Sequence, residues 1–405
     1  SQAAFSDLDV KRELAKHLDD PFALRAAIDK VFASPELVKL FEGIYTTRDY
    51  LNAEARLDSA AHAMASAGGF GVRANTVDDA IAAQNAALQK AFGGGLSDEQ
   101  QAAIRHVTGD GHLACVVGLA GAGKSTMLAS AVEIWRMNGV AVHGAAVSGK
   151  AADGLHQAAG IASRTLASLE LSWKNGYDPI KRGDVLVIDE AGMVGTRALA
   201  RVADKLKAVG AKLVLVGDPD QLRPIAAGMP FQRLIDTHGA ARLTAIHRQK
   251  EDWQKHASRD LAAGDVAAAV AAYDGRGAVQ RANDRGSAIL KVVTKYMADV
   301  ESHGADTSRL ALAHRRRDVF ALNQAIRAAM RHTGHIVDAD TLIHTPTGPR
   351  AFAPGDRVVL TRNDKGLDVK NGMLGTVRQV IPQEGAQSDG GQSHHKEGHP
   401  LNPNG

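Results

Sequence analysis

The spacing of apolar positions changes near residue 96. Over residues 1–92, apolar side chains recur at steps of three and four residues. Examples are Leu37, Leu40, Phe41 and Ile44. This spacing predicts amphipathic helices. A run of three glycines at 93–95 interrupts the pattern and indicates a hinge. We therefore expect a helical segment over residues 1–95.

Beyond the glycines, short and nearly uninterrupted apolar runs alternate with longer helical patterns. The runs lie at 113–117, 140–147, 185–188 and 213–216. Helical patterns occupy 124–137 and 196–208. Strands of a parallel sheet read as continuous apolar runs because helices cover both faces of the sheet. The pattern therefore predicts an α/β domain with a parallel sheet over residues 96–240.

The rest of the chain divides into three parts. Residues 241–334 contain a strand candidate at 309–313 and a helical pattern at 316–331. Residues 335–381 are rich in turn signals and short strand patterns, which predicts a small β-rich, barrel-like insert. Residues 382–405 hold almost no apolar side chains, so we expect them to be disordered.

Composition limits the class of protein. The chain has 405 residues, of which 44% are hydrophobic and 23% charged, values typical of a folded globular protein of two or three domains. The net charge is only +3. That balance permits nucleic-acid binding without requiring it, because phosphate attraction depends on where Lys and Arg cluster.

The ends and the single cysteine bear on the cellular setting. Cys115 is the only cysteine, so neither an intrachain disulfide nor a thiolate metal cage can form. Such a chain suits a reducing cytoplasm. No apolar run reaches the roughly 18 residues that a membrane span needs. The chain begins with Ser1 and carries no signal pattern, so we expect it to be the cut end of a larger protein.

A glycine-rich sequence follows the first apolar run. Gly118-Leu-Ala-Gly-Ala-Gly123-Lys124-Ser125 fits G-x-x-x-x-G-K-[ST] and stands directly between a strand and a helix pattern. Glycines let backbone N–H groups surround a phosphate, and the helix N-terminus adds positive charge. Lys124 would reach the β- and γ-phosphates, and Ser125 would ligate Mg²⁺. The alternative, a glycine turn with an incidental lysine, does not explain the strand–loop–helix setting.

Two further strands end in polar residues at the same predicted edge. Asp189 and Glu190 follow the run at 185–188. Asp189 is placed to bind Mg²⁺, and Glu190 to polarise the attacking water as a general base. Gln221 follows the run at 213–216 in VGDPDQLRPI, where it would orient water beside the γ-phosphate. Alone, each group would read as an ordinary solvated side chain or turn.

Three weaker signals have plain alternatives. Gln100 lies in a helix start capped by Ser97, and its amide is also suited to contact a base. Lys150, two residues after Ser148, would hold a nucleic-acid phosphate or serve as a surface charge. Arg248, in AIHRQ, would reach a γ-phosphate across a domain cleft or be a surface charge as well.

Together and in this order, the motifs resemble the RecD-like superfamily 1B DNA helicases. The matching segments are LSDEQQAAI (96–104), GLAGAGKST (118–126), AAVSGKAADGL (145–155), VIDEAGMV (187–194), VGDPDQLRPI (216–225) and AIHRQ (245–249). IYTTRDYLNAEARL (44–57), HRRRDVFALNQAIR (314–327) and GDRVVLTRNDKGLDVKNGMLGTV (355–377) are similar to the relaxase–helicases of Ti-type conjugation systems. The resemblance covers residues 40–381.

The resemblance implies a P-loop fold of two RecA-like lobes that close on ATP and Mg²⁺. The second lobe would occupy 241–334 and carry an SH3-like insert at 335–381. The two lobes would step along single-stranded DNA in the 5′ to 3′ direction, with the conjugation machinery as partner. Lys124, Glu190, Gln221 and Arg248 would be catalytic, and Ser125 and Asp189 would bind the metal. The implied nucleotide contacts are Gln100, which would read the adenine, Gly118, Ala120, Gly121, Ala122, Gly123, Lys124, Ser125 and Thr126. The implied DNA contacts are Ser148, Lys150 and Thr165.

Two departures from the family pattern set further expectations. No H-x-H cluster is present, so we expect no nicking domain. The motifs that complete the second lobe should follow residue 381, where a polar tail stands instead, so we expect that lobe to be incomplete and hydrolysis to be slow. An ATP-binding remnant without unwinding activity is the alternative function. A small-molecule kinase is disfavoured by VGDPDQLRPI.

Overall fold

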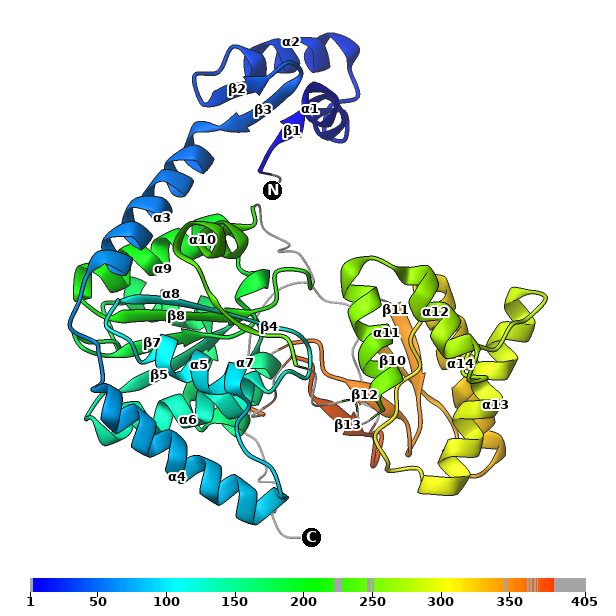
Figure 1. The fold of residues 1–405 in the computed structure, drawn as a ribbon. Helices are drawn as coiled ribbons and strands as arrows, with labels where there is room; N and C mark the ends of the chain where they lie inside the picture. The colour runs from blue at the N-terminus through cyan, green and yellow to red at the C-terminus, as the bar shows by residue number, and fades with distance from the viewer. Residues whose placement is uncertain are drawn as a thin grey trace. The chain divides into compact units, whose positions relative to one another are not determined.

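The computed structural model divides the chain into two compact units, Ser1–Gln280 with Thr361–Gly372, and Arg281–Leu360 with Met373–Gly405 (Figure 1). The structure describes residues 3–221, 228–245, 249, 251–345, 348–362, 364, 366, 367, 369 and 371–381. The expected disorder of 382–405 lies outside this part. The five-part domain division stays a prediction.

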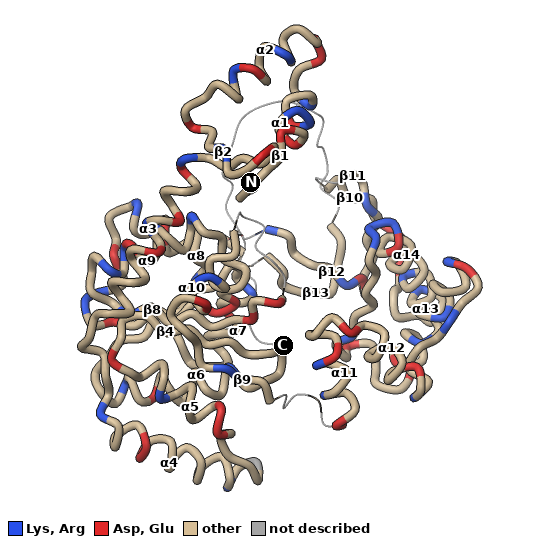
Figure 2. Tube along the Cα trace, turned by 45° about the horizontal axis from the view of Figure 1, so that its top comes forward, with Lys and Arg blue, Asp and Glu red and all other residues tan. Residues whose placement is uncertain are grey.

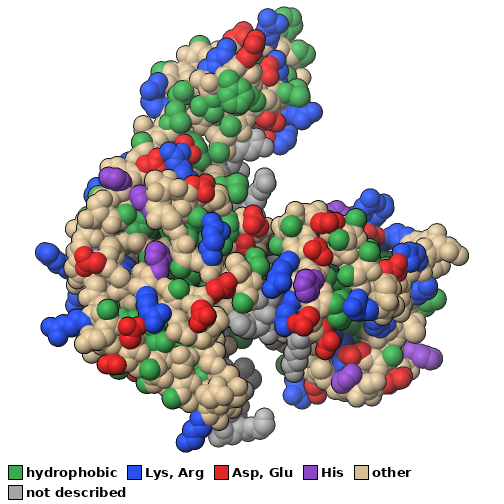
Figure 3. All heavy atoms as spheres, in the orientation of Figure 1, with side chains coloured by type: hydrophobic (Ala, Val, Ile, Leu, Met, Phe, Trp, Pro, Cys, Tyr) green, Lys and Arg blue, Asp and Glu red, His purple; other side chains and the backbone are tan. Residues whose placement is uncertain are grey.

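The first unit begins with a small module rather than with helices alone. Three antiparallel strands in the order β1-β3-β2 accompany two helices. The elements are β1 (Phe5–Ser6), α1 (Asp7–Leu14), α2 (Pro21–Phe32), β2 (Leu37–Phe41) and β3 (Ile44–Thr47). Hydrophobic side chains gather on the face of this module seen in Figure 3. Among its exposed residues are Phe22 (86%) and Phe41 (65%).

The helix predicted across residues 37–44 is therefore wrong. Its apolar spacing comes from a hairpin whose turn includes Gly43, with φ of 69°, a value that glycine adopts without steric cost. The pairing register of β2 shifts between Lys39 and Phe41, and this irregularity lets one strand contain the adjacent apolar residues Leu40 and Phe41. A bulged strand and a tight turn can thus imitate helical spacing.

The next two helices confirm the helical prediction for the following stretch. They are α3 (Arg48–Ser66) and α4 (Ala74–Phe92). The buried face of α3 consists of Tyr50, Ala53, Leu57, Ala60, Ala61 and Met64, three or four residues apart or adjacent. Tyr50 Oη lies 3.0 Å from Thr196 Oγ1, and Arg197 Nε donates to Asp49 at 2.6 Å. These contacts make α3 part of the α/β domain.

A six-stranded sheet of parallel pairs forms the centre of the first unit. Its order is β6-β5-β7-β8-β4-β9. The strands are β4 (Leu113–Gly118), β5 (Val142–Ala146), β6 (Ala162–Thr165), β7 (Val185–Ile188), β8 (Lys212–Gly217) and β9 (Ala241–Leu243). Four of them, β4, β5, β7 and β8, confirm the strands predicted from apolar runs.

Helices cover both faces of this sheet, as predicted (Figure 1). They are α5 (Asp98–Val107), α6 (Lys124–Met137), α7 (Gly149–Ala159), α8 (Leu166–Lys174), α9 (Thr196–Val209) and α10 (Pro230–His238). Side chains alternate along β4: Cys115 and Val117 join the core with α3, α8, α9 and α10, whereas Ala114 and Val116 join the core with α4 to α7. The period of two in a strand therefore divides one sheet between two cores.

Two more helices follow in the same unit. α11 (Asp252–Ala263) and α12 (Val266–Asp274) form a helical pair. The rings of Trp253 and Tyr273 meet edge to face with centroids 5.0 Å apart. Arg276 lies 4.3 Å from the centroid of the Trp253 ring, which adds a cation–π contact.

Among its described residues, the second unit contains two helices and four strands. They are α13 (Arg285–His303), α14 (Arg316–His332), β10 (Thr341–Thr345), β11 (Gly348–Phe352), β12 (Arg357–Val359) and β13 (Leu374–Thr376). The strands make two antiparallel pairs, β10–β11 and β12–β13, which confirms a β-rich region after residue 335. The predicted strand at 309–313 is wrong, because this segment pairs with no strand in the described part of the chain. Leu310 and Leu312 are 80% and 83% exposed.

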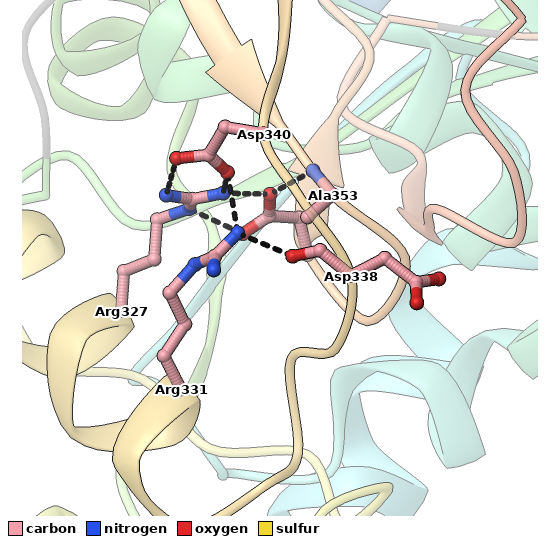
Figure 4. A network of polar contacts seen from close by, with 6 residues as sticks. Arg327, Arg331, Asp338, Asp340 and Ala353 are labelled. Atoms are coloured by element: carbon pink, nitrogen blue, oxygen red, sulfur yellow. Dashed lines mark hydrogen bonds and ion pairs between the residues drawn. The ribbon is translucent and has the colours of Figure 1, made fainter.

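A polar network fixes α14 to the β-rich region (Figure 4). Arg327 donates from Nε and from one terminal nitrogen to the two carboxylate oxygens of Asp356, both at 2.7 Å. It also reaches Asp340, at 2.7 and 3.2 Å. Arg331 donates to Asp340 at 2.6 Å. Asp356 is 7% exposed and accepts the Ala353 N–H at 2.8 Å, so its charge is compensated where water is scarce.

Among the described residues, none of the helices has the length and apolar content needed to cross a membrane.

Candidate nucleotide and DNA site

The glycine-rich loop connects β4 to α6 as its sequence predicts. Gly121 and Gly123 have φ of 81° and 79°, a left-handed conformation that residues with a Cβ avoid. A Cβ at Gly118 would lie 2.7 Å from Cγ of Lys124. The loop therefore needs glycine for its backbone path and for the room that Lys124 occupies.

Lys124 is the first residue of α6, and its side chain folds over the loop. Its Nζ donates to Gly118 O at 2.7 Å and lies 3.4 Å from Leu119 O. The N-terminus of α6 carries unpaired N–H groups and partial positive charge. A cation and a helix N-terminus at one loop make an anion site. Gly118 is the last residue of β4, and the loop or the start of α6 contains the other predicted contacts, Ala120, Gly121, Ala122, Gly123, Ser125 and Thr126.

Asp189 and Glu190 follow β7, two strands away from the loop in the sheet. Asp189 accepts the Glu190 N–H at 2.9 Å. Glu190 has φ of 53°, a conformation that costs a non-glycine residue about 1–3 kcal/mol and is found mostly at functional sites. In the sheet, β8 lies between β7 and β4, and Gln221 follows β8 in sequence.

Close packing holds these two strand ends together. A Cβ at Gly192 would lie 2.6 Å from Asp218 O, and one at Gly217 would lie 2.9 Å from Ala191 N. Gln221 Nε2 donates to Asp218 Oδ2 at 3.2 Å. The glycines let the loops after β7 and β8 touch, and Asp218 fixes where Gln221 lies. Sequence reasoning had assigned no role to Asp218, whose hydrogen bond only the structure reveals.

Both carboxyl groups at this edge of the sheet have a pKa above the ordinary value for their residue type. Burial raises the pKa of Asp189, although the Glu190 N–H and Lys124 oppose the shift. Burial also raises the pKa of Glu190, and the negative charges of Asp189 and Asp218 add to that rise while Lys124 lowers it. Acids with a raised pKa in a partly buried polar site are typical of catalytic groups.

These groups fit a magnesium ion bound together with a nucleotide. Mg²⁺ takes one or two protein oxygens and completes its shell with phosphates and water. The Ser125 hydroxyl and the half-buried Asp189 carboxylate supply such oxygens. No group of three or more His, Cys, Asp or Glu side chains suited to a metal occurs among the described residues, so an all-protein metal cage is not what this part of the chain offers.

Gln100 makes contacts that its predicted role did not include. Its Nε2 donates to Gly123 O at 3.1 Å, and its Oε1 accepts the Ser97 N–H at 2.9 Å. The residue is 5% exposed. Its amide thus braces the phosphate loop and completes the helix cap. The contact to adenine stays a prediction.

The predicted DNA contacts lie at the ends of two neighbouring strands. Ser148 and Thr165 follow or end β5 and β6, whose last residues pair as Ala146 with Thr165. Both hydroxyls accept a helix N–H at 3.1 Å, from Ala151 and Ser168 respectively. Lys150 is exposed in the first turn of α7. The structure brings all three to the same edge of the sheet as the phosphate loop.

One predicted catalytic residue cannot be placed. Arg248 and its neighbour His247 lie outside the described residues. The chain leading to them is described as far as Ala245.

Comparisons with known proteins agree with this geometry. Residues 95–284 match the family model of an AAA domain. The chain is 39% identical over 388 residues to the "Probable conjugal transfer protein TraA" of Sinorhizobium fredii, covering 93% of this chain and 34% of that protein. It is 29% identical over 311 residues to the "ATP-dependent RecD2 DNA helicase" of Deinococcus radiodurans, covering 72% of this chain and 39% of that protein.

Among solved structures, the Pif1 helicase from Candida albicans aligns with 71% of this chain and 70% of that chain, at 18% identity and a TM-score of 0.40. The chain spans about a third of the length of the TraA relative. Residues 95–284 therefore match an AAA domain, whose phosphate loop and parallel sheet are those of a P-loop fold, and the chain is similar over most of its length to TraA conjugal transfer proteins and more distantly to RecD-type helicases.

Proposed function

We propose that this chain is the motor segment of a conjugative DNA helicase, which couples ATP hydrolysis to 5′-to-3′ movement along single-stranded DNA. The observation that carries the proposal is the meeting of three groups on neighbouring strands: the phosphate loop after β4, Gln221 after β8, and the Asp189–Glu190 pair after β7. The relatives are named a conjugal transfer protein and a DNA helicase. These names support DNA as the polymer along which the chain would move.

Each group has a separate task in phosphoryl transfer. The loop N–H groups and Lys124 bind and orient the phosphates. Glu190 accepts a proton from the attacking water, and Gln221, fixed by Asp218, orients that water. Ser125 and Asp189 would hold Mg²⁺, which when bound neutralises charge on the phosphate oxygens. Arg248 is proposed to stabilise the γ-phosphate, and Gln100 to contact the adenine.

The DNA track would run along the edge that carries Ser148, Lys150 and Thr165. Proteins bind single strands in part through contacts of Lys and Arg with backbone phosphates. A motor of this kind would work in the cytoplasm with other components of the conjugation machinery as partners. The alternative is a segment that binds ATP without moving DNA.

The test measures ATP binding and steady-state ATP turnover with and without single-stranded DNA. We expect Lys124→Ala to abolish nucleotide binding with an unchanged circular dichroism spectrum. Glu190→Gln should keep binding but lower turnover by about a hundredfold or more. Lys207→Ala, an exposed lysine on α9, is the control and should leave both unchanged.

Three outcomes separate the readings. Turnover that rises with single-stranded DNA supports the motor. Tight ATP binding without any DNA-stimulated turnover supports the alternative. Equal nucleotide affinity in Lys124→Ala and the parent would show that the loop is not the nucleotide site.

A further inference from the structure

The first turn of α5 contacts a segment that lies far away in sequence. Glu99 Oε2 accepts the N–H groups of Thr244 at 2.7 Å and Ala245 at 3.0 Å. Its Oε1 accepts the Thr244 hydroxyl at 2.5 Å. One carboxylate therefore receives three donors from two consecutive residues that follow β9. Hydrogen bonds to an ionised carboxylate are stronger than neutral ones.

The same turn of α5 also holds the phosphate loop. Gln100, next to Glu99, donates to Gly123 O at 3.1 Å. On the other side, β9 pairs with β4, and Leu119 N donates to Leu243 O at 3.1 Å. Leu119 thus ties the loop directly to the end of β9, and α5 links the loop indirectly to the chain that follows β9.

We propose that Glu99 is a positioning residue for ATP turnover: it fixes the course of the chain after β9 relative to the phosphate loop. This inference rests on the proposed motor function. In this proposal, Glu99 contacts neither the substrate nor the metal. It acts through Thr244 and Ala245, the two residues that directly follow β9, and so fixes the path of the chain as it leaves the sheet.

A plainer reading of Glu99 is available and makes a different prediction. Acidic residues in the first turn of a helix are favoured by the partial positive charge there, and Asp98 and Glu99 both occupy that turn of α5. If Glu99 served only this purpose, replacing either acid would have the same small effect. Asp98 is exposed and is therefore a matched control in charge and in position.

The first measurement is amide hydrogen exchange of Thr244 and Ala245. In Glu99→Ala their exchange should become faster by about tenfold or more, because their N–H groups lose their acceptor. In Asp98→Asn the exchange should match that of the parent. Equal exchange in Glu99→Ala and the parent would overturn the positioning role, whatever the turnover shows.

The second measurement is steady-state ATP turnover with saturating single-stranded DNA. We expect Glu99→Ala to lower kcat by about tenfold with KM for ATP within about twofold, because the phosphate loop and Gln100 are untouched. Glu99→Gln keeps an acceptor oxygen but loses the charge, so it should fall in between. Thr244→Val removes one donor to Glu99 without changing α5, and it should also lower kcat. This variant tests the proposal even if Glu99→Ala folds poorly.

The outcomes distinguish the two proposals. A parent chain that hydrolyses no ATP contradicts the motor function, and hydrogen exchange then still decides whether Glu99 holds the segment. A parent that turns over normally while folded Glu99→Ala and Thr244→Val match it overturns the positioning role alone. A loss of melting temperature with unchanged kcat would assign Glu99 to stability only.

Discussion

At the scale of single residues, the candidate site concentrates strain and charge at Glu190. The residue adopts a left-handed conformation with φ of 53° directly after a buried strand. The neighbouring glycines let the loop after β8 approach to contact distance, and Asp189 accepts the Glu190 N–H. Packing and hydrogen bonding therefore maintain a conformation that the isolated residue would avoid.

The pKa of Glu190 gives a prediction about pH. Burial, Asp189 and Asp218 raise this pKa, and a general base must be ionised, so turnover should fall on acidification at a higher pH than for an ordinary glutamate. Asp218→Asn removes one of the negative charges and should move this acidic limb of the kcat profile to lower pH. Asp220→Asn, an exposed neighbour, should leave the limb in place. Identical limbs in parent and Asp218→Asn would contradict the electrostatic account.

Lys212 gives a prediction about stability. It is 1% exposed, and its Nζ donates to Gly109 O at 2.6 Å. Burial lowers the pKa of Lys212 to about 8. Between this value and the usual lysine pKa of about 10.4, the unfolded chain binds the proton more strongly, so the free energy of unfolding should rise with pH by up to about 3 kcal/mol.

The measurement is urea unfolding from pH 7 to 10 on the parent and on Lys212→Met. Cys115 acts in the opposite direction, because burial raises the pKa of its thiol to about 12 and favours the unfolded thiolate above the ordinary value. The difference between the two curves removes this contribution, since both proteins contain Cys115. A difference that does not change with pH would show that Lys212 keeps an ordinary pKa when folded.

Motifs predicted the residues of the phosphate loop, and the strand–loop–helix setting is confirmed. The contacts of Asp218 and Glu99 were not predictable in the same way. Glu99 and Thr244 are separated by 145 positions, and no local pattern marks either residue as a partner of the other. Single-residue roles at the site stay predictions until the variants are measured.

At the scale of elements, the buried apolar strands of the sheet were predicted and its two edge strands, β6 and β9, were missed. β7 and β8 are buried along their whole length, so their apolar runs are plain. β6 has the sequence ASRT and is only partly buried, and β9 has three residues. Helices cover the faces of these edge strands less completely, so fewer of their side chains are buried and fewer need to be apolar. Sequence patterns alone therefore define the centre of a sheet better than its edges.

The segment 309–313 shows the reverse error. Its alternating apolar residues are typical of a strand, but a strand is stable only when another strand accepts its backbone hydrogen bonds. Alternation is visible within a few residues of sequence, whereas the strand that would pair with them can lie anywhere in the chain. The hairpin of β2 and β3 shows the same limit of local patterns. The apolar positions of its irregular strand and its turn happen to have the spacing of a helix.

The network around Arg327 gives a prediction at this scale. Arg327→Met should leave the buried Asp356 carboxylate without its main partner and lower the stability of the second unit by about 2–3 kcal/mol. The measurement is hydrogen exchange at Ala353, whose N–H donates to Asp356. Arg327→Met combined with Asp356→Asn should recover part of the loss, because the uncompensated charge is gone. Arg350→Met, at an exposed arginine of β11, is the control.

At the scale of the whole molecule, acidic and basic residues are mixed over much of the part that the structure describes (Figure 2). Figure 2 shows acidic and basic residues interspersed, for example along α1 and α9. Net charge is +3, which gives little general attraction for a polyanion, so the proposed DNA binding would depend on particular groups. Lys150 is the exposed cation among the proposed contacts.

This yields the last prediction, on DNA binding. Single strands should bind in preference to duplex, and affinity should fall with rising salt because each Lys or Arg contact with a phosphate releases counterions. Lys150→Ala should reduce the slope of log affinity against log salt by about one contact, while KM for ATP stays the same because Lys150 lies on α7 and not on the phosphate loop. Lys174→Ala, at the last residue of α8, should keep the parent slope. If Lys150→Ala also keeps it, Lys150 is an ordinary surface charge and the DNA track runs elsewhere on the molecule.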